Sequence, residues 1–444
     1  MSPSWSQLWI LRSIRQMSLR SSPFCLFCLS IVLIGFSAQA QTTSPSLGQT
    51  PQKVKASTPG ATQTTASSSK EAVRQRFVLD VVQSAVALPQ PDPQDRLRVL
   101  SAAANVISPI NSKMAKQFAK EGARIETELV SSGEKPAVSM IAAGQVDCDG
   151  ALNFVQTIPT AAVLNAEQSL VGAITNCPQA HVAAARKVEA GMQQGVVAAR
   201  AVLALMEQDG MKSQWSQRMF VQLFASLPAD AVEYTAEAPN YAAMFVRAAP
   251  EMDKDAVKTA GLKFLLWMAK LPDSNERKVA VNMATDLLNK FLGQDAYDEL
   301  LRSDVMAQQV AASADKDAVL TSPAEENTSV LRAMQRTDDR TSELESLPAS
   351  MRAREAAASG FASGVAGDRK SADHYFDIAF TSLDEVWSSR ASSNTSAPEV
   401  VQEVSEAAAQ VDPTEALQRT QRLQDPSAEA IGMLAVARVV VGSE

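Results

Sequence analysis

The chain has 444 residues, of which 46% are hydrophobic, 20% are charged and only 5% are aromatic. Its formal charge is −8, from 41 basic and 49 acidic side chains. This balance argues against nucleic acid as a partner, because phosphate contacts need clustered Lys and Arg. The two histidines and four cysteines exclude a metal cluster rich in those ligands. Abundant alanine and scarce aromatic residues favour helices over strands, so we predict an all-α fold.

Residues 1–40 have the features of a secretory signal peptide. An apolar run over 24–36 is shorter than the roughly 20 residues that span a bilayer. Ala38 and Ala40 then fit the small-residue cleavage pattern, so we expect cleavage after Ala40. A start at Met17 would give a more ordinary signal, and an uncleaved membrane anchor is the alternative. The apolar run is preceded by basic residues and no acidic ones: Arg12, Arg15 and Arg20.

We therefore expect a periplasmic or secreted protein with no transmembrane segment after cleavage. Removing the signal takes three arginines and leaves 38 basic against 49 acidic residues, a formal charge of −11. Residues 41–69 consist almost wholly of Ser, Thr, Gln, Pro, Ala and Gly. Such a segment buries too little apolar surface to offset the entropy of ordering its backbone. We predict a disordered linker there.

Helical patterns begin at a capping box formed by Ser68 and Glu71. Apolar residues over 77–88 recur at spacings of three and four, which places them on one helical face. An aspartate followed by proline is typical of a helix start, because the aspartate caps free amides and proline fits the first turn. This pattern and one related serine-proline pair occur at Asp92-Pro93, Asp412-Pro413, Asp425-Pro426 and Ser108-Pro109.

The rest of the chain reads as one amphipathic helix after another, which suggests stacked helical hairpins, an α-solenoid. We predict a hairpin domain over 70–312, a linker over 313–328 and a second helical domain over 329–444. The stretch Leu262–Met268 is apolar nearly all round and should be a covered helix. Two apolar stripes are predicted on helical faces: Val188, Met192, Val196, Ala199, Leu203 and Met206; and Ala280, Ala284, Leu287, Leu288 and Phe291.

Residues 351–387 read as a helix, a turn at Gly367-Asp368 and a second helix. Small and aromatic residues fall at the spacings of a known repeat: Gly360, Ala372, Phe376 and Ala379. This segment resembles a single tetratricopeptide repeat, and the resemblance implies a binding scaffold rather than an enzyme. Other repeat positions depart from the pattern, holding Ala356, Ser359, Ser363 and Asp384.

Cys148 and Cys177 are the only cysteines that remain after cleavage of the signal. In an oxidising compartment such a pair most often forms a disulfide, so we predict a structural bridge across one helical hairpin. The alternatives are two buried thiols and, less favoured, a catalytic thiol. His181 follows Cys177 closely, but Pro178 intervenes and no third catalytic group is indicated.

The remaining candidates for chemistry are one histidine and several acidic residues. His374 lies in the second helix of the repeat-like segment and should sit near the surface or a groove. A metal site there would need carboxylate ligands. Glu345-Ser346 matches a dipeptide found in lytic transglycosylases, but the rest of that family's signature is missing. The acidic residues considered for glycan cleavage are Asp338, Asp339, Glu343, Glu345, Asp384 and Glu385.

No sequence motif identifies a catalytic, cofactor-binding or metal-binding residue, and we expect no cofactor. The leading hypothesis is an exported helical-repeat scaffold that binds another protein or peptide in a groove. The alternative is a cell-envelope protein that binds or cleaves glycan through the carboxylates above. A structural envelope protein without a discrete site is a third reading. The oligomeric state and the partner's identity stay open.

Overall fold

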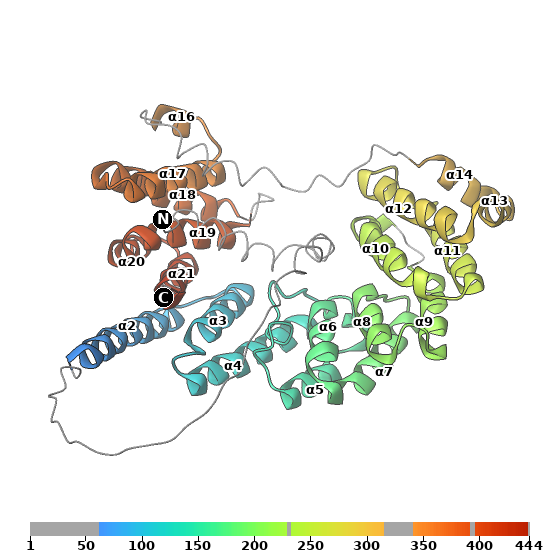
Figure 1. The fold of residues 1–444 in the computed structure, drawn as a ribbon, viewed down its shortest axis with the longest axis horizontal. Helices are drawn as coiled ribbons and strands as arrows, with labels where there is room; N and C mark the ends of the chain where they lie inside the picture. Colours follow the sequence, from blue (N-terminus) through green and yellow to red (C-terminus); the bar gives the residue numbers. More distant parts are fainter. Residues whose placement is uncertain (1–61, 229–231, 315–340, 391–395, 443–444) are drawn as a thin grey trace, which may run out of the picture. The chain divides into compact units, whose positions relative to one another are not determined.

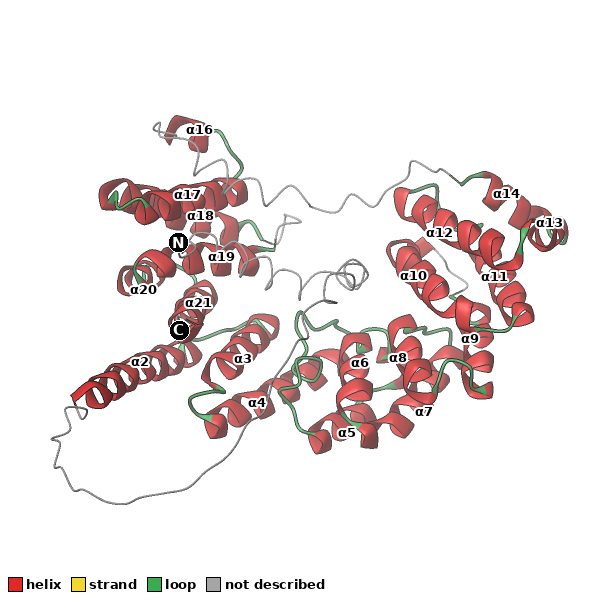
Figure 2. Ribbon diagram, viewed as in Figure 1, coloured by secondary structure: helices red, strands yellow, loops and turns green. Residues whose placement is uncertain are grey.

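The computed structural model of the chain describes residues 62–228, 232–314, 341–390 and 396–442. The chain divides into two units, Met1–Ala61 and Thr62–Glu444, and every described residue lies in the second. The described residues form α-helices and short 3-10 turns and contain no strand (Figure 1; Figure 2), which confirms the predicted all-α fold. Across these ranges no helix is both long and apolar enough to cross a membrane. The predicted signal peptide lies outside the described residues.

The described part begins with three helices. The first starts at Thr62, so the predicted cap at Ser68 is wrong and the predicted linker is helical from Thr62 onward. Extending a helix that is already nucleated costs little, even through serine and threonine. Asp92 caps the next helix as predicted, accepting a hydrogen bond from the Gln94 amide at 2.9 Å. The bounds are α2 (Thr62–Ala87), α3 (Pro93–Ile107) and α4 (Ser112–Ser131).

The predicted cap at Ser108 is also wrong. Ser108 ends α3, because its amide still bonds to the carbonyl of Ala104 at 3.1 Å. The chain then turns, and Asn111 caps α4 by accepting from the Met114 amide at 3.1 Å. A proline after serine therefore lies in a turn here and not in the first turn of a helix.

The middle of the chain runs from α5 to α14. The stripe predicted over 188–206 is divided between two helices, because Gly195 adopts a φ of +75° in the connection between them. Leu262–Met268 is the end of a well-covered helix, as predicted, with Phe264 and Leu265 fully buried. The bounds are α5 (Cys148–Thr157), η2 (Thr160–Ala162), α6 (Glu167–Asn176), η3 (Pro178–Ala180), α7 (His181–Gln193), α8 (Ala199–Asp209), α9 (Gln214–Ala225), η4 (Val232–Glu237), α10 (Ala238–Ala248), η5 (Ala249–Glu251), α11 (Lys254–Met268), α12 (Asn275–Leu292), α13 (Gln294–Arg302) and α14 (Val305–Ala312).

The C-terminal part contains the helix–turn–helix predicted over 351–387. Gly367, with a φ of +85°, makes the turn, and Asp368 caps the second helix by accepting from the Ser371 amide. The caps predicted at Asp412 and Asp425 are confirmed by bonds from the amides two and three residues further on. The bounds are α16 (Thr341–Glu345), α17 (Ala349–Val365), α18 (Arg369–Ser388), α19 (Ala397–Val411), α20 (Pro413–Thr420) and α21 (Pro426–Gly442).

Alternate helices of the middle part contact one another. α6 contacts α8, α8 contacts α10, and α10 contacts α12. α9 and α14 both contact α11. The core between these helices is aromatic at its centre. The ring centroid of Phe224 lies 5.1 Å from those of both Phe245 and Phe264, and all three side chains are buried.

Side chains on one helix also hold the backbone at a later helix. Glu167 at the start of α6 accepts from the Arg200 amide of α8 at 2.8 Å, 33 residues later. Gln217 of α9 accepts from the Asp253 amide before α11 at 3.0 Å, 36 residues later. Asp384 of α18 accepts from the Gln424 amide before α21 at 3.0 Å, 40 residues later.

The first helices share a core with the last ones. α2 and α3 both contact α21, and Val78, Val82 and Val99 belong to one apolar cluster with buried residues of α17 to α21. Most of the middle helices fill a separate cluster that extends from Val130 to Val310. A smaller cluster joins α3 and α4 to Met140. The C-terminal core is therefore completed by the N-terminal part of the folded chain.

Candidate functional site

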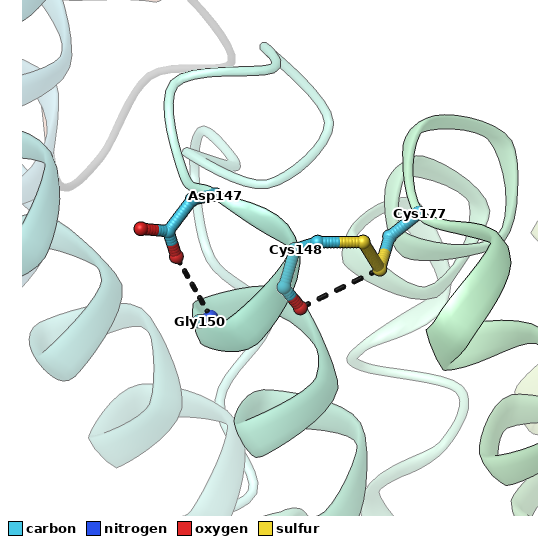
Figure 3. Close-up of a disulfide and its surroundings, with 4 residues drawn as sticks. All are labelled: Asp147, Cys148, Gly150 and Cys177. Carbon is cyan, nitrogen blue, oxygen red and sulfur yellow. Dashed lines mark hydrogen bonds between the residues drawn. A yellow bond between two sulfur atoms is a disulfide. The ribbon is translucent and has the colours of Figure 1, made fainter.

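Cys148 and Cys177 lie at disulfide distance, with Cα atoms 5.2 Å apart and their sulfur atoms joined (Figure 3). Cys148 begins α5, just after Asp147 caps that helix through the Gly150 amide at 2.9 Å. Cys177 ends α6, so the bridge links the start of one helix to the end of the next. The Cys177 sulfur also lies 3.4 Å from the Cys148 carbonyl oxygen. A bridged sulfur carries no hydrogen, so this is a packing contact.

With the two sulfurs joined, neither cysteine carries a thiolate that attacks a substrate. Cys177 is 1% exposed and belongs to the apolar core of the middle part. The Nε2 atom of His181 is buried and has no hydrogen-bond partner within the described structure.

His374 lies on the surface of α18, as predicted. Its Nε2 atom lies 3.0 Å from the Thr341 hydroxyl oxygen, and its ring contacts Tyr375 with centroids 5.6 Å apart. Within the described ranges, no group of three or more histidine, cysteine or acidic side chains is placed to hold a metal ion.

Two of the candidate carboxylates contact other groups of the C-terminal helices. Asp384 accepts from the Gln424 amide, and Glu385 pairs with Arg352, whose Nε also donates to Ser382. Glu343 and Glu345 lie exposed on the short helix α16. Asp338 and Asp339 lie outside the described residues.

Of the four residues on which the repeat resemblance rests, Gly360 of α17 meets Phe376 of α18, and the other two lie buried on α18. Ala372, Phe376 and Ala379 are at most 2% exposed. A Cβ atom on Gly360 would lie 3.1 Å from three ring atoms of Phe376, tighter than ordinary van der Waals contact. Glycine at this position lets the aromatic ring approach the backbone of α17.

A charged pocket adjoins this helical pair, between α18, α19 and α20. Its apolar wall is made by Ala372, Phe376, Ala408 and Val411. Arg419 also lines it, with 8% of its side chain exposed. The arginine pairs with Asp373 at 3.3 Å, Asp377 at 3.2 Å and Glu415 at 3.5 Å.

A second ion pair lines the same pocket. Arg369, which is 68% exposed, pairs with Asp412 at 3.2 Å. The pKa of Asp412 is lowered, chiefly by a hydrogen bond from the Glu415 backbone amide. Its carboxyl group is therefore ionised at neutral pH. This pocket was not predicted from the sequence. The sequence feature that indicated it is the spacing of Asp373 and Asp377, because residues four positions apart share a helix face.

Glu126 is another polar residue whose role was not predicted from the sequence. It is 0% exposed on α4 and accepts from the Met140 amide at 3.0 Å and from the Ser169 hydroxyl. Burial raises its pKa, although hydrogen bonds from Ser139, Ser169 and two backbone amides oppose the shift. These bonds tie the segment before α5 to α4 and α6, which gives Glu126 a structural role.

Comparisons of the chain with protein-family models, curated proteins and solved structures find no match. The described residues define an all-α protein with a cysteine pair at disulfide distance and a charged pocket in its C-terminal part.

Proposed function

We propose that this chain is an exported helical-repeat scaffold that binds another protein or a peptide. The contact of alternate helices is the observation that carries the proposal. Stacked hairpins place every second helix side by side, and α6, α8, α10 and α12 form such a series. A stack of this kind presents long surfaces for binding without any catalytic group.

The C-terminal part supports the same arrangement. α17 contacts α19 and α19 contacts α21, again with one helix between members of the series. The bonds from Glu167, Gln217 and Asp384 to the backbone at a later helix span 33 to 40 residues. Such spacings are close to the 34 residues of a tetratricopeptide repeat. We extend the resemblance from residues 351–387 to a TPR-like packing of these helices.

Export is part of the proposal. The apolar run over 24–36 and the pattern ending at Ala40 favour a signal peptide cleaved in transit to the periplasm or the exterior. A cysteine pair at disulfide distance is consistent with an oxidising compartment.

Cross-linking in the native host, followed by affinity purification from the envelope fraction, tests this function. A recurrent stoichiometric protein partner is the expected result. The N-terminus of the purified protein should be Gln41. Retention of cell-wall fragments in place of a protein would contradict the scaffold and favour the glycan hypothesis. A partner that still binds after the chain is unfolded would also contradict it.

A further inference from the structure

The pocket between α18, α19 and α20 has an excess of negative charge around an apolar wall. Asp373, Asp412 and Glu415 line it, against the two cations Arg369 and Arg419. Asp377, which does not line the pocket, adds a further carboxylate beside it through its contact with Arg419. The excess carboxylates favour a cation in this pocket and disfavour an anion.

Arg419 is not available to an anionic ligand. It is almost fully buried, and three carboxylates surround its guanidinium group at 3.2 to 3.5 Å. An anion would have to displace one of these carboxylates and then face the others. The role of Arg419 is to hold Asp373 and Glu415 in place at the pocket.

The carboxylates keep capacity for another donor. Arg419 contacts Oδ1 of Asp373 and Oε1 of Glu415, while a carboxylate offers about four acceptor positions. The side chain of Asp373 is 57% exposed and that of Glu415 is 39% exposed, so a ligand can reach both.

The wall of the pocket suits a long aliphatic stem. Phe376 and Val411 supply apolar surface beside the carboxylates. Lysine and arginine place methylene groups along such surface while their charged ends reach acidic groups. Arg369 lines the pocket as an exposed cation paired with Asp412, and a surface pair of this kind is weak.

We propose that this pocket receives a lysine or arginine side chain of the protein or peptide that the scaffold binds. This inference rests on the proposed function and names the chemistry of the partner. Arg369 acts as an internal competitor, because its guanidinium group neutralises one of the carboxylates that an incoming basic side chain would contact.

The proposal is tested by selecting random short peptides that bind to the protein from Gln41 to Glu444. The affinity of the selected peptides is then measured by fluorescence titration. We expect enrichment of Lys and Arg and an affinity that falls with added salt. The double substitution Asp373→Asn with Glu415→Gln should weaken binding about 5-fold to 20-fold, as the loss of two exposed ionic contacts predicts. Arg369→Gln should strengthen binding about 2-fold to 5-fold, because it removes the competing cation.

Two controls make the outcome decisive. Asp286→Asn removes an exposed carboxylate on α12 and should leave binding unchanged. Circular dichroism of each variant confirms that its helices are retained. Selection without a preference for basic residues overturns the inference, as does weaker binding by Arg369→Gln. If cross-linking finds a protein partner that these variants bind normally, the scaffold stands and the pocket inference alone fails.

Discussion

The carboxylate of Asp95 at the start of α3 accepts a hydrogen bond at 2.8 Å from Arg390, which lies 295 residues later in the chain. The side chain of Asp95 is 6% exposed and that of Arg390 is 33% exposed. The guanidinium group also lies 4.4 Å from the centroid of the Trp387 ring. Arg98 and Glu399 form a more exposed pair across the same contact at 3.2 Å. The N-terminal helices are thus joined to the C-terminal ones by charge as well as by the apolar core.

Replacing Arg390 with alanine should destabilise the protein by about 2 kcal/mol at neutral pH, because it leaves Asp95 buried without its partner. Burial raises the pKa of Asp95, and Arg390 opposes that shift. Without Arg390 the folded-state pKa rises further, so the variant loses stability as the pH rises through that value. Urea denaturation from about pH 4 to about pH 8 measures the effect.

Arg98→Ala is the matched control, since its pair with Glu399 is more exposed and should contribute less than about 1 kcal/mol. The double variant Asp95→Asn with Arg390→Ala should recover part of the lost stability. Equal losses from Arg390→Ala and Arg98→Ala would contradict the role given to the Asp95–Arg390 pair.

Replacing both Cys148 and Cys177 with serine should lower the free energy of unfolding by about 3–4 kcal/mol. The chain-entropy model gives this value for a loop of 29 residues. Mass mapping without reductant should find the two cysteines linked, and reductant should destabilise the natural protein but not the double variant. Free thiols at both positions in the purified protein would disprove the bridge.

Glu126 should make stability depend on pH. Its folded-state pKa lies above the ordinary value of 4.5, so the folded protein binds more protons than the unfolded chain in the intervening range. The contribution of Glu126 to the free energy of unfolding is therefore fully present below about pH 4.5. It is lost as the pH rises through the folded-state pKa. Each unit of difference corresponds to about 1.4 kcal/mol.

Glu126→Gln tests this effect, because it keeps the size of the side chain and removes its titration. We expect the variant to lack the fall in stability above about pH 4.5 in urea denaturation. Glu126→Ala should cost about 2 kcal/mol or more, since it leaves the Met140 amide and the Ser169 hydroxyl without this acceptor. An unchanged pH profile in Glu126→Gln would show that Glu126 is not the group responsible.

Gly360→Ala should destabilise the C-terminal part by about 1–3 kcal/mol. The added methyl group would lie 3.1 Å from the Phe376 ring, and overpacking of this kind outweighs the better helix propensity of alanine. Gly442→Ala is the control, because a Cβ atom added there, at the end of α21, would meet no neighbouring atom within 4 Å. Thermal unfolding compares the two variants. Phe376→Leu in the Gly360→Ala background should restore stability, and equal effects of the two glycine substitutions would contradict the close contact.

The sequence by itself determined the local features of this protein. Spacings of apolar residues predicted helices, aspartates before prolines predicted caps at Asp92, Asp412 and Asp425, and a glycine predicted the turn at Gly367. These features depend on residues within a few positions of one another. Even there, Ser108 and the stripe over 188–206 were misread, because Asn111 caps the helix after Ser108 and Gly195 lies in a turn that divides the stripe between two helices.

Only the tertiary structure decided which distant helices meet. The contact of α2 and α3 with α21, the burial of Asp95 beside Arg390 and the pocket around Arg419 each join residues with no local relationship in sequence. An aspartate or arginine on a helix has the same local pattern whether it faces solvent or a neighbouring helix. Its partner is set by the free energy of packing the whole core, which no single helix specifies.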